Sequence, residues 1–168
     1  MDINSIKTPG LVLDLERVRD NAARISDIAK RNNVRLRPHV KTHKCIEVAK
    51  IQTAGHDGAI TVSTLAEARA FGANGFTDIT YAVPIERGKF GEAIEILRDG
   101  TRLNLLTDDA DTVTDLNDAA GKAGVKFDVF VKIDCGTHRV GVEPQTSEAT
   151  DIPRQISDAA NLNFAGIL

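Results

Sequence analysis

The fold is decided by residues 102–133, whose sequence is RLNLLTDDADTVTDLNDAAGKAGVKFDVFVKI. Apolar residues at 102–106 predict a β-strand, amphipathic sequence at 110–123 predicts a helix, and apolar residues at 127–133 predict a second strand. Two short apolar strands joined by a helix are typical of a parallel sheet with helical crossovers. We therefore expect a mostly parallel sheet that is covered by helices.

The same alternation extends in both directions from this segment. Residues 8–14 read as extended, and further strands are predicted at 34–38, 59–63, 78–82 and 163–168. Further helices are predicted at 15–31, 45–54, 65–73, 89–98 and 147–160. The near-regular repeat favours an α/β fold of the parallel (β/α) TIM-barrel type, although six strands are also compatible with an open sheet. A complete eight-stranded barrel takes about 250 residues, so 168 residues predict an incomplete one with about six strands.

Composition excludes several classes of function. A hydrophobic fraction of 42% predicts a soluble globular protein, and a net charge of −3 without a basic face argues against nucleic acid as a partner. No apolar run approaches the length of a membrane span, so no membrane association is expected. The first residues lack the pattern of a signal peptide, which makes a cytoplasmic location the expected one.

A cluster of basic residues follows the predicted strand at 34–38 and precedes the helix at 45–54. Its sequence at 37–44 is RPHVKTHK, so it lies in a strand-to-helix loop, where α/β folds bind their ligands. Lys41 lies among other cations and is expected to be partly desolvated, and both conditions favour a neutral amine that attacks carbonyl groups. Lys41 is therefore a candidate Schiff-base lysine. On local composition alone, the favoured interpretation is a solvated basic patch or a phosphate-attracting surface.

A second polar cluster, KIDCGTHRVG at 132–141, follows the predicted strand at 127–133. Because the carboxyl ends of parallel strands meet at one face, this cluster is expected near Lys41. Arg139 is a candidate clamp for an oxyanion of a cofactor or substrate, or alternatively a partner of Asp134 that stiffens the loop. Lys132 lies where a buried strand is predicted and therefore needs an acidic partner or a modification.

Two further patterns have a structural interpretation. The spacing of the histidines matches no zinc signature, so no metal site is predicted in this chain. Residues 63–67, STLAE, are typical of a helix start in which Ser63 or Thr64 caps the helix and Glu67 completes a capping box.

Taken together, several motifs resemble one family. They are TP at 8–9 with LVLD at 11–14, RPHVKTHK at 37–44, VSTLAEA at 62–68, YAVP at 81–84 and KIDCGTHRVGV at 132–142. This ordered set resembles the pyridoxal-phosphate enzymes of the alanine racemase fold, and most closely their branch of D-serine dehydratases and D-threonine aldolases. The resemblance runs from about residue 8 to the end of the sequence.

The resemblance implies roles for individual residues. Lys41 would hold pyridoxal 5′-phosphate as a Schiff base and act as a base at the Cα proton of a small D-amino acid substrate. Arg139 would lie near the phenolic oxygen of the cofactor, and His39 and Tyr81 would lie near its ring or the substrate. Lys132 matches a position that is carbamylated in some alanine racemases. The implied activity is that of a lyase on β-hydroxy D-amino acids, either a dehydratase or an aldolase.

The resemblance also implies what lies outside this sequence. Residues 1–168 would form the N-terminal part of the cofactor-binding barrel, without the β-rich C-terminal domain of the family. Most contacts to the cofactor phosphate and a divalent metal would belong to the full-length protein, which we expect to be a homodimer. The chain alone is expected to bind the cofactor weakly and to turn over poorly.

Three other activities remain open at this point. They are amino-acid racemisation on the same cofactor, non-catalytic binding of pyridoxal phosphate, and a cofactor-free Schiff-base aldolase. Racemases of this fold need a second base, commonly a tyrosine from the C-terminal domain, so residues 1–168 do not decide this alternative.

Overall fold

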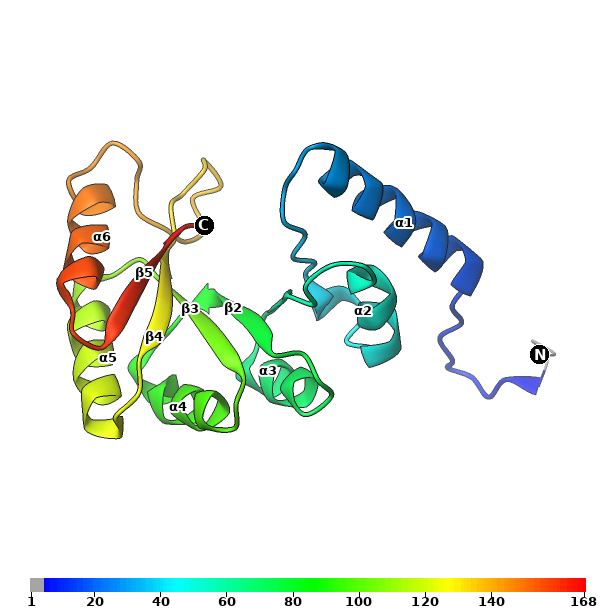
Figure 1. Ribbon diagram of the computed structural model, residues 1–168, viewed down its shortest axis with the longest axis horizontal. Coiled ribbons are helices and arrows are strands. Elements are labelled where there is room, and N and C mark those ends of the chain that lie inside the picture. Colours follow the sequence, from blue (N-terminus) through cyan, green and yellow to red (C-terminus); the bar gives the residue numbers. More distant parts are fainter. Residues whose placement is uncertain (1–4) are drawn as a thin grey trace.

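The computed structural model describes residues 5–168. Its helices and strands alternate along most of the chain (Figure 1). In order they are α1 (Leu15–Arg31), η2 (Val40–Thr42), α2 (Ile46–Thr53), β1 (Ile60–Val62), α3 (Leu65–Gly72), β2 (Asp78–Pro84), η3 (Arg87–Lys89), α4 (Phe90–Arg98), β3 (Arg102–Thr107), α5 (Ala110–Ala123), β4 (Phe127–Val131), α6 (Glu148–Asp158) and β5 (Leu162–Ile167). η2 and η3 are short 3₁₀ helices.

The sheet is that of a partial (β/α) barrel. Its five strands are parallel and lie in the order β1-β2-β3-β4-β5, so each strand pairs with the next one in the chain. Figure 1 shows α3, α4, α5 and α6 following one another around one face of this sheet. A doubly wound sheet has a reversal in its strand order and helices on both faces. The predicted barrel architecture is therefore confirmed, and the alternative of a doubly wound sheet is wrong.

The strand predicted at 34–38 does not form. This segment is extended, but it meets β1 only where Thr61 N–H donates to Pro38 O at 2.8 Å and where His39 forms an isolated parallel bridge with Thr61. Pro38 has no N–H to donate, which limits a ladder at this point. The sheet thus has five strands, not the six expected from the sequence.

The core lies between the sheet and helices α3–α6. Alternate residues of β2 and β3, such as Ile79, Tyr81, Leu103 and Leu105, belong to this core and are at most 1% exposed. The residues between them point to the other face of the sheet, since successive side chains of a strand alternate. That face is polar near its amino-terminal edge, where Asn104 donates to Asp78 Oδ1 at 2.8 Å.

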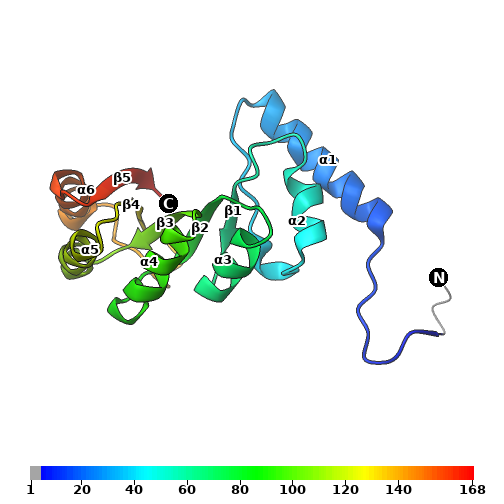
Figure 2. The same ribbon diagram turned by 60° about the horizontal axis from the view of Figure 1, so that its bottom comes forward.

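Helices α1 and α2 lie together beyond β1, at the end of the molecule away from β5 (Figures 1 and 2). α1 begins at Leu15, and the carboxylate of the preceding Asp14 caps the helix by accepting from Arg17 N–H. The 11–14 segment before it is irregular, and Leu11 is 89% exposed. None of the helices within residues 5–168 combines the length and the apolar character that a membrane span needs.

Candidate active site

Lys41 lies in η2, in the loop that follows the 34–38 segment. His39 caps this short helix, because its Nδ1 accepts from the Lys41 backbone N–H at 3.3 Å. The bridge between His39 and Thr61 places the loop beside the carboxyl end of β1. Lys41 is thus located at the edge of the sheet where the sequence predicted a binding site.

The other basic side chains of the 37–44 loop have partners within the chain. Arg37 forms an ion pair with Asp78, with Nη1 at 2.9 Å from Oδ1 and Nη2 at 3.0 Å from Oδ2. Lys44 Nζ lies 3.1 Å from Glu67 Oε1. Arg37 therefore turns toward the start of β2, and Lys44 turns toward the first turn of α3.

His43 holds the start of α2. Its Nδ1 accepts from the Cys45 backbone N–H at 3.0 Å, and its Nε2 lies 2.9 Å from Gln52 Oε1. This pattern assigns the proton to Nε2, which donates to the amide oxygen. Both ring nitrogens are therefore used in local structure.

Lys41 differs from these neighbours. Within residues 5–168, the structure gives its ammonium group no ion pair and no hydrogen bond. The expectation that Lys41 is partly desolvated is wrong, since its side chain is exposed. The loop lies beyond β1, the first strand of an open sheet, so no strand of the described chain covers it from the other side. Lys41 is therefore available to a ligand.

His39 is half-buried, and the charges of Lys41 and Glu67 both act on it. Burial lowers the pKa of His39, and the positive charge of Lys41 lowers it further. The charge of Glu67 and a hydrogen bond with the Thr61 backbone oppose this shift without reversing it. His39 is therefore neutral near pH 7, which agrees with its role as an acceptor for the Lys41 N–H.

The start of α3 forms as the sequence predicts. Thr64 Oγ1 accepts from Glu67 N–H at 3.0 Å, and Glu67 Oε2 accepts from the Ser63 backbone N–H at 2.8 Å. The Ser63 hydroxyl also donates to the same carboxylate. The sequence did not reveal the ion pair with Lys44, which connects this helix start to the loop of Lys41.

Tyr81 lies on the helix-covered face of β2. Its side chain is 1% exposed and belongs to the hydrophobic core. Lys89 Nζ lies 3.4 Å from its hydroxyl oxygen and 6.0 Å from the centre of its ring. No hydrogen bond or ion pair joins Tyr81 to the Lys41 loop within the described chain, so its role near the cofactor stays a prediction.

The 132–142 loop follows β4 and is organised by Asp134, which is 6% exposed. Asp134 Oδ1 accepts from the backbone N–H groups of Gly136 and Thr137, each at 2.9 Å, and of His138 at 3.1 Å. Burial raises the pKa of Asp134, but these hydrogen bonds lower it more, so the net shift is downward. Asp134 is thus an ionised anchor of the turn.

Arg139 is exposed and has no ion pair within residues 5–168. The alternative in which it pairs with Asp134 is wrong, because backbone N–H groups and His138 occupy that carboxylate.

Three strands, β1, β2 and β3, lie between β4 and the Lys41 loop along the open sheet. Both loops nevertheless lie at the carboxyl edge, which becomes one opening when such a sheet closes into a barrel.

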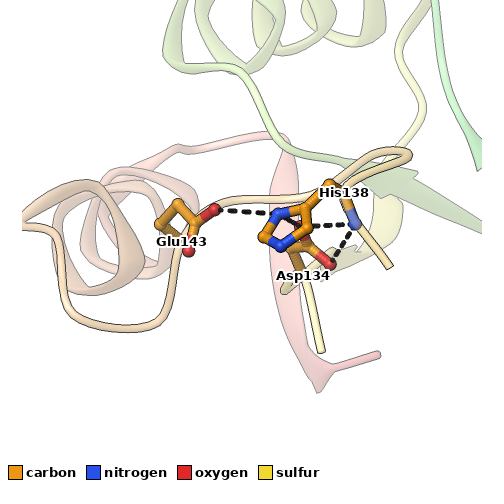
Figure 3. Close-up of side chains that lie close together, drawn as sticks. All are labelled: Asp134, His138 and Glu143. Atoms are coloured by element: carbon orange, nitrogen blue, oxygen red, sulfur yellow. Dashed lines mark hydrogen bonds and ion pairs between the residues drawn. The ribbon is translucent and has the colours of Figure 1, made fainter. Parts of the chain in front are cut away.

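Figure 3 shows Asp134, His138 and Glu143 directed toward one another. His138 Nδ1 lies 3.1 Å from Asp134 Oδ2 and 3.5 Å from Glu143 Oε1. All three ligand atoms lie within 4.8 Å of one another, a separation that a metal ion can bridge. His138 already links the two carboxylates, and Asp134 is also used by the turn, so loop structure accounts for this cluster.

Lys132 follows the last residue of β4 and is half-buried. The expected acidic partner is not found among the described residues, because this lysine lies beyond the strand and remains in contact with solvent. Its side chain instead packs beside Gly141. The sequence leaves carbamylation of Lys132 open, and no contact in the structure tests it.

The fold and the loops define a class: a (β/α) barrel portion with an unpaired lysine at the carboxyl edge of its sheet. A family model described as "Alanine racemase, N-terminal domain" matches residues 13–168. The chain belongs to this family.

Individual relatives agree with that assignment. The chain is 37% identical over 163 residues to D-threo-3-hydroxyaspartate dehydratase of Delftia sp. (strain HT23), covering 97% of this chain and 42% of the relative. It is 36% identical over 160 residues to D-serine dehydratase of Dictyostelium discoideum, covering 90% and 40%. The crystal structure of D-threonine aldolase from Filomicrobium marinum superimposes with a TM-score of 0.88 at 34% identity, covering 96% and 44%. The chain thus spans less than half the length of these relatives.

Proposed function

We propose that this chain supplies the lysine-bearing barrel portion of a pyridoxal-phosphate lyase that acts on β-hydroxy D-amino acids. The observation that supports this most directly is the unpaired, exposed Lys41 in a loop whose neighbouring lysine and arginine are neutralised by carboxylates. The names of the relatives support the substrate class, since they act as dehydratases or aldolases on hydroxy D-amino acids. The dehydratase and the aldolase reaction both fit the residues described.

The residues present fit the aldehyde end of pyridoxal phosphate. An amine without an internal partner is the donor that an aldehyde requires, and Lys41 is such an amine. Arg139 is a permanent cation without an internal partner, suited to the phenolic oxygen of the cofactor when the sheet closes. The cofactor, when bound, supplies an electron sink for cleavage of a bond at Cα.

The chain's own residues would then orient groups and move one proton. His39 accepts from the Lys41 N–H and fixes the backbone at the point where this lysine leaves the loop. With substrate in place, the amine of Lys41 would be the base that takes the Cα proton of the substrate. Loss of this proton together with the β-hydroxyl group would give dehydration. In the aldolase reaction, a proton would instead be lost from the β-hydroxyl group as the bond between Cα and Cβ breaks, and a proton would be returned to Cα.

The experiment that tests this function is reductive trapping. The chain and its Lys41→Ala variant are treated with pyridoxal phosphate and then borohydride, and adducts are located by peptide mass. We expect an adduct on Lys41 that is lost in the variant, and Lys122→Ala, which removes an exposed lysine of α5, serves as the matched control. Equal labelling of surface lysines without preference for Lys41 would contradict the proposal.

Other expectations remain proposals of the same kind. The full-length protein is proposed to be a homodimer, to bind a divalent metal outside this chain and to be cytoplasmic. Residues 1–168 are proposed to form the N-terminal part of the cofactor-binding domain.

A further inference from the structure

Two lysines of the same loop lie three positions apart, and within residues 5–168 only one of them has a carboxylate partner. We propose that Glu67 is a positioning residue that directs the carbonyl carbon of the cofactor to Lys41 by engaging the side chain of Lys44 in an ion pair. This inference rests on the proposed function, because it concerns which amine of the 39–44 loop bonds to pyridoxal phosphate.

Access to solvent does not separate the two lysines. The side chain of Lys44 is 61% exposed, and Lys41 is also exposed. Both follow His39 in the loop that lies beside the carboxyl end of β1. Lys44 is therefore a second exposed amine of the same short loop, and a property other than exposure has to distinguish the two.

The carboxylate of Glu67 supplies that property. It is 7% exposed, and it accepts from the Ser63 N–H at 2.8 Å and lies 3.1 Å from Lys44 Nζ. Burial raises the pKa of Glu67, but the Ser63 N–H, Lys44 and the Ser63 hydroxyl together lower it more, so Glu67 remains ionised. It is a fixed negative charge beside the loop.

The cost of using Lys44 follows from this burial. Imine formation requires a neutral amine: the nitrogen bonds to the aldehyde carbon, the ammonium proton goes to solvent, and the carbonyl oxygen leaves as water. If Lys44 reacts, Glu67 keeps a buried negative charge without its cation, which is unfavourable. If Lys41 reacts, no ion pair within the described chain is broken. The aldehyde is therefore directed to Lys41.

Glu67→Gln tests this assignment, because glutamine has nearly the same shape and still accepts from Ser63. The variant and the unchanged chain are trapped with pyridoxal phosphate and borohydride, and adducts are quantified by peptide mass. In the unchanged chain we expect Lys41 to exceed Lys44 by about tenfold or more, and in Glu67→Gln we expect the two to become comparable. In the double variant Glu67→Gln with Lys44→Met, the adduct should return to Lys41.

A purely structural role for Glu67 would lower both adducts together without changing their ratio, and that result would overturn the inference while leaving the proposed function intact. Absence of any Lys41 adduct in the unchanged chain would overturn both.

A second measurement needs no variant and decides the matter if Glu67→Gln does not fold. The unchanged chain is treated with a limiting amount of formaldehyde and with borohydride, which methylate accessible lysine amines. The methylation rates of individual lysines are then compared by peptide mass. Lys44 should react several-fold more slowly than Lys122, which is exposed and has no ion pair among the described residues. Equal rates would overturn the inference.

Discussion

Arg37 and Asp78 form a bidentate ion pair. It connects the segment before the Lys41 loop to the first residue of β2. The guanidinium nitrogens lie 2.9 and 3.0 Å from the two carboxylate oxygens. Arg35 also contacts Asp78, at 2.7 Å, and Asn104 donates to it at 2.8 Å. This contact fixes the 34–38 segment beside the sheet although that segment lacks a regular ladder, so it supports the loop that presents Lys41.

Asp78→Asn is expected to destabilise the chain by about 2 kcal/mol, because it leaves Arg37 partly buried without its negative partner. Unfolding in urea at pH 7 measures this change. Asp115→Asn is the matched control, since Asp115 pairs with the exposed Arg87 and should change stability by less than about 1 kcal/mol. Equal effects of the two substitutions would show that the Asp78 contact does not support the fold.

Stability should also fall at acidic pH through Asp78. Burial raises the pKa of Asp78, but Arg37, Asn104 and Arg35 lower it more, from 3.8 to about 2. Because the pKa is lower in the folded state, the contribution is complete above the unfolded value and is lost as pH falls from about 4 through about 2. Solvent screening reduces it to about 1–2 kcal/mol. Urea midpoints between pH 5 and pH 2 should fall less in Asp78→Asn than in the unchanged chain.

The order of strands and helices was predictable because short apolar strands and amphipathic helices each have their own period. The absence of a strand at 34–38 was not predictable. The local pattern of this segment is that of a strand, but a strand forms only where a neighbouring strand pairs with it across the sheet. Lys41 was identifiable from its motif. Its exposure was not, because burial of a loop depends on which elements flank it in space.

The partners of charged residues show the same limit. Glu67 was recognised as part of a helix start, since a capping box depends only on local spacing. Its ion pair with Lys44 joins residues 23 positions apart, from 44 to 67, and no local pattern indicates it. The position of Tyr81 was not predictable for a similar reason. The register of the sheet decides to which face of β2 its side chain points, and local sequence does not fix that register.

His39 should titrate below the value of an unperturbed histidine, and the charge of Lys41 should contribute to this shift. In Lys41→Ala the pKa of His39 should rise, but it should stay low because burial is the larger cause. Since the folded pKa is the lower one, protonation of His39 disfavours the fold as pH falls below about 6.5. Chemical shifts of the histidine ring protons between pH 5 and 8 measure both values. An unchanged pKa in Lys41→Ala would mean that the two side chains do not interact.

Substitutions at Tyr81 separate a packing role from contact with the cofactor. Tyr81→Ala should cost about 3–5 kcal/mol, because it removes a ring that is 1% exposed. Tyr81→Phe should cost less than about 1.5 kcal/mol, because only the contact with Lys89 is lost. If Tyr81 acts only in the core, Tyr81→Phe leaves trapping of pyridoxal phosphate at Lys41 unchanged. A clear decrease in trapping with stability retained would instead support the cofactor contact predicted from the sequence.

Gly141 is required where the 132–142 loop turns back on β4. Its φ is +112°, and an added Cβ would lie 2.7 Å from Asp134 N and 2.8 Å from Ile133 C, which are backbone atoms that cannot move aside. Gly136 is the matched control, since its φ is +95° but an added Cβ meets nothing within 4 Å.

Both alanine substitutions therefore introduce backbone strain of about 1–3 kcal/mol, and only Gly141→Ala adds a steric clash. We expect Gly141→Ala to lower the free energy of unfolding by at least about 1 kcal/mol more than Gly136→Ala. Urea unfolding of the two variants measures the difference. Equal losses would mean that the loop relaxes around the added methyl group, and that the contact between the Gly141 N–H and Asp108, 2.8 Å in this structure, does not restrain it.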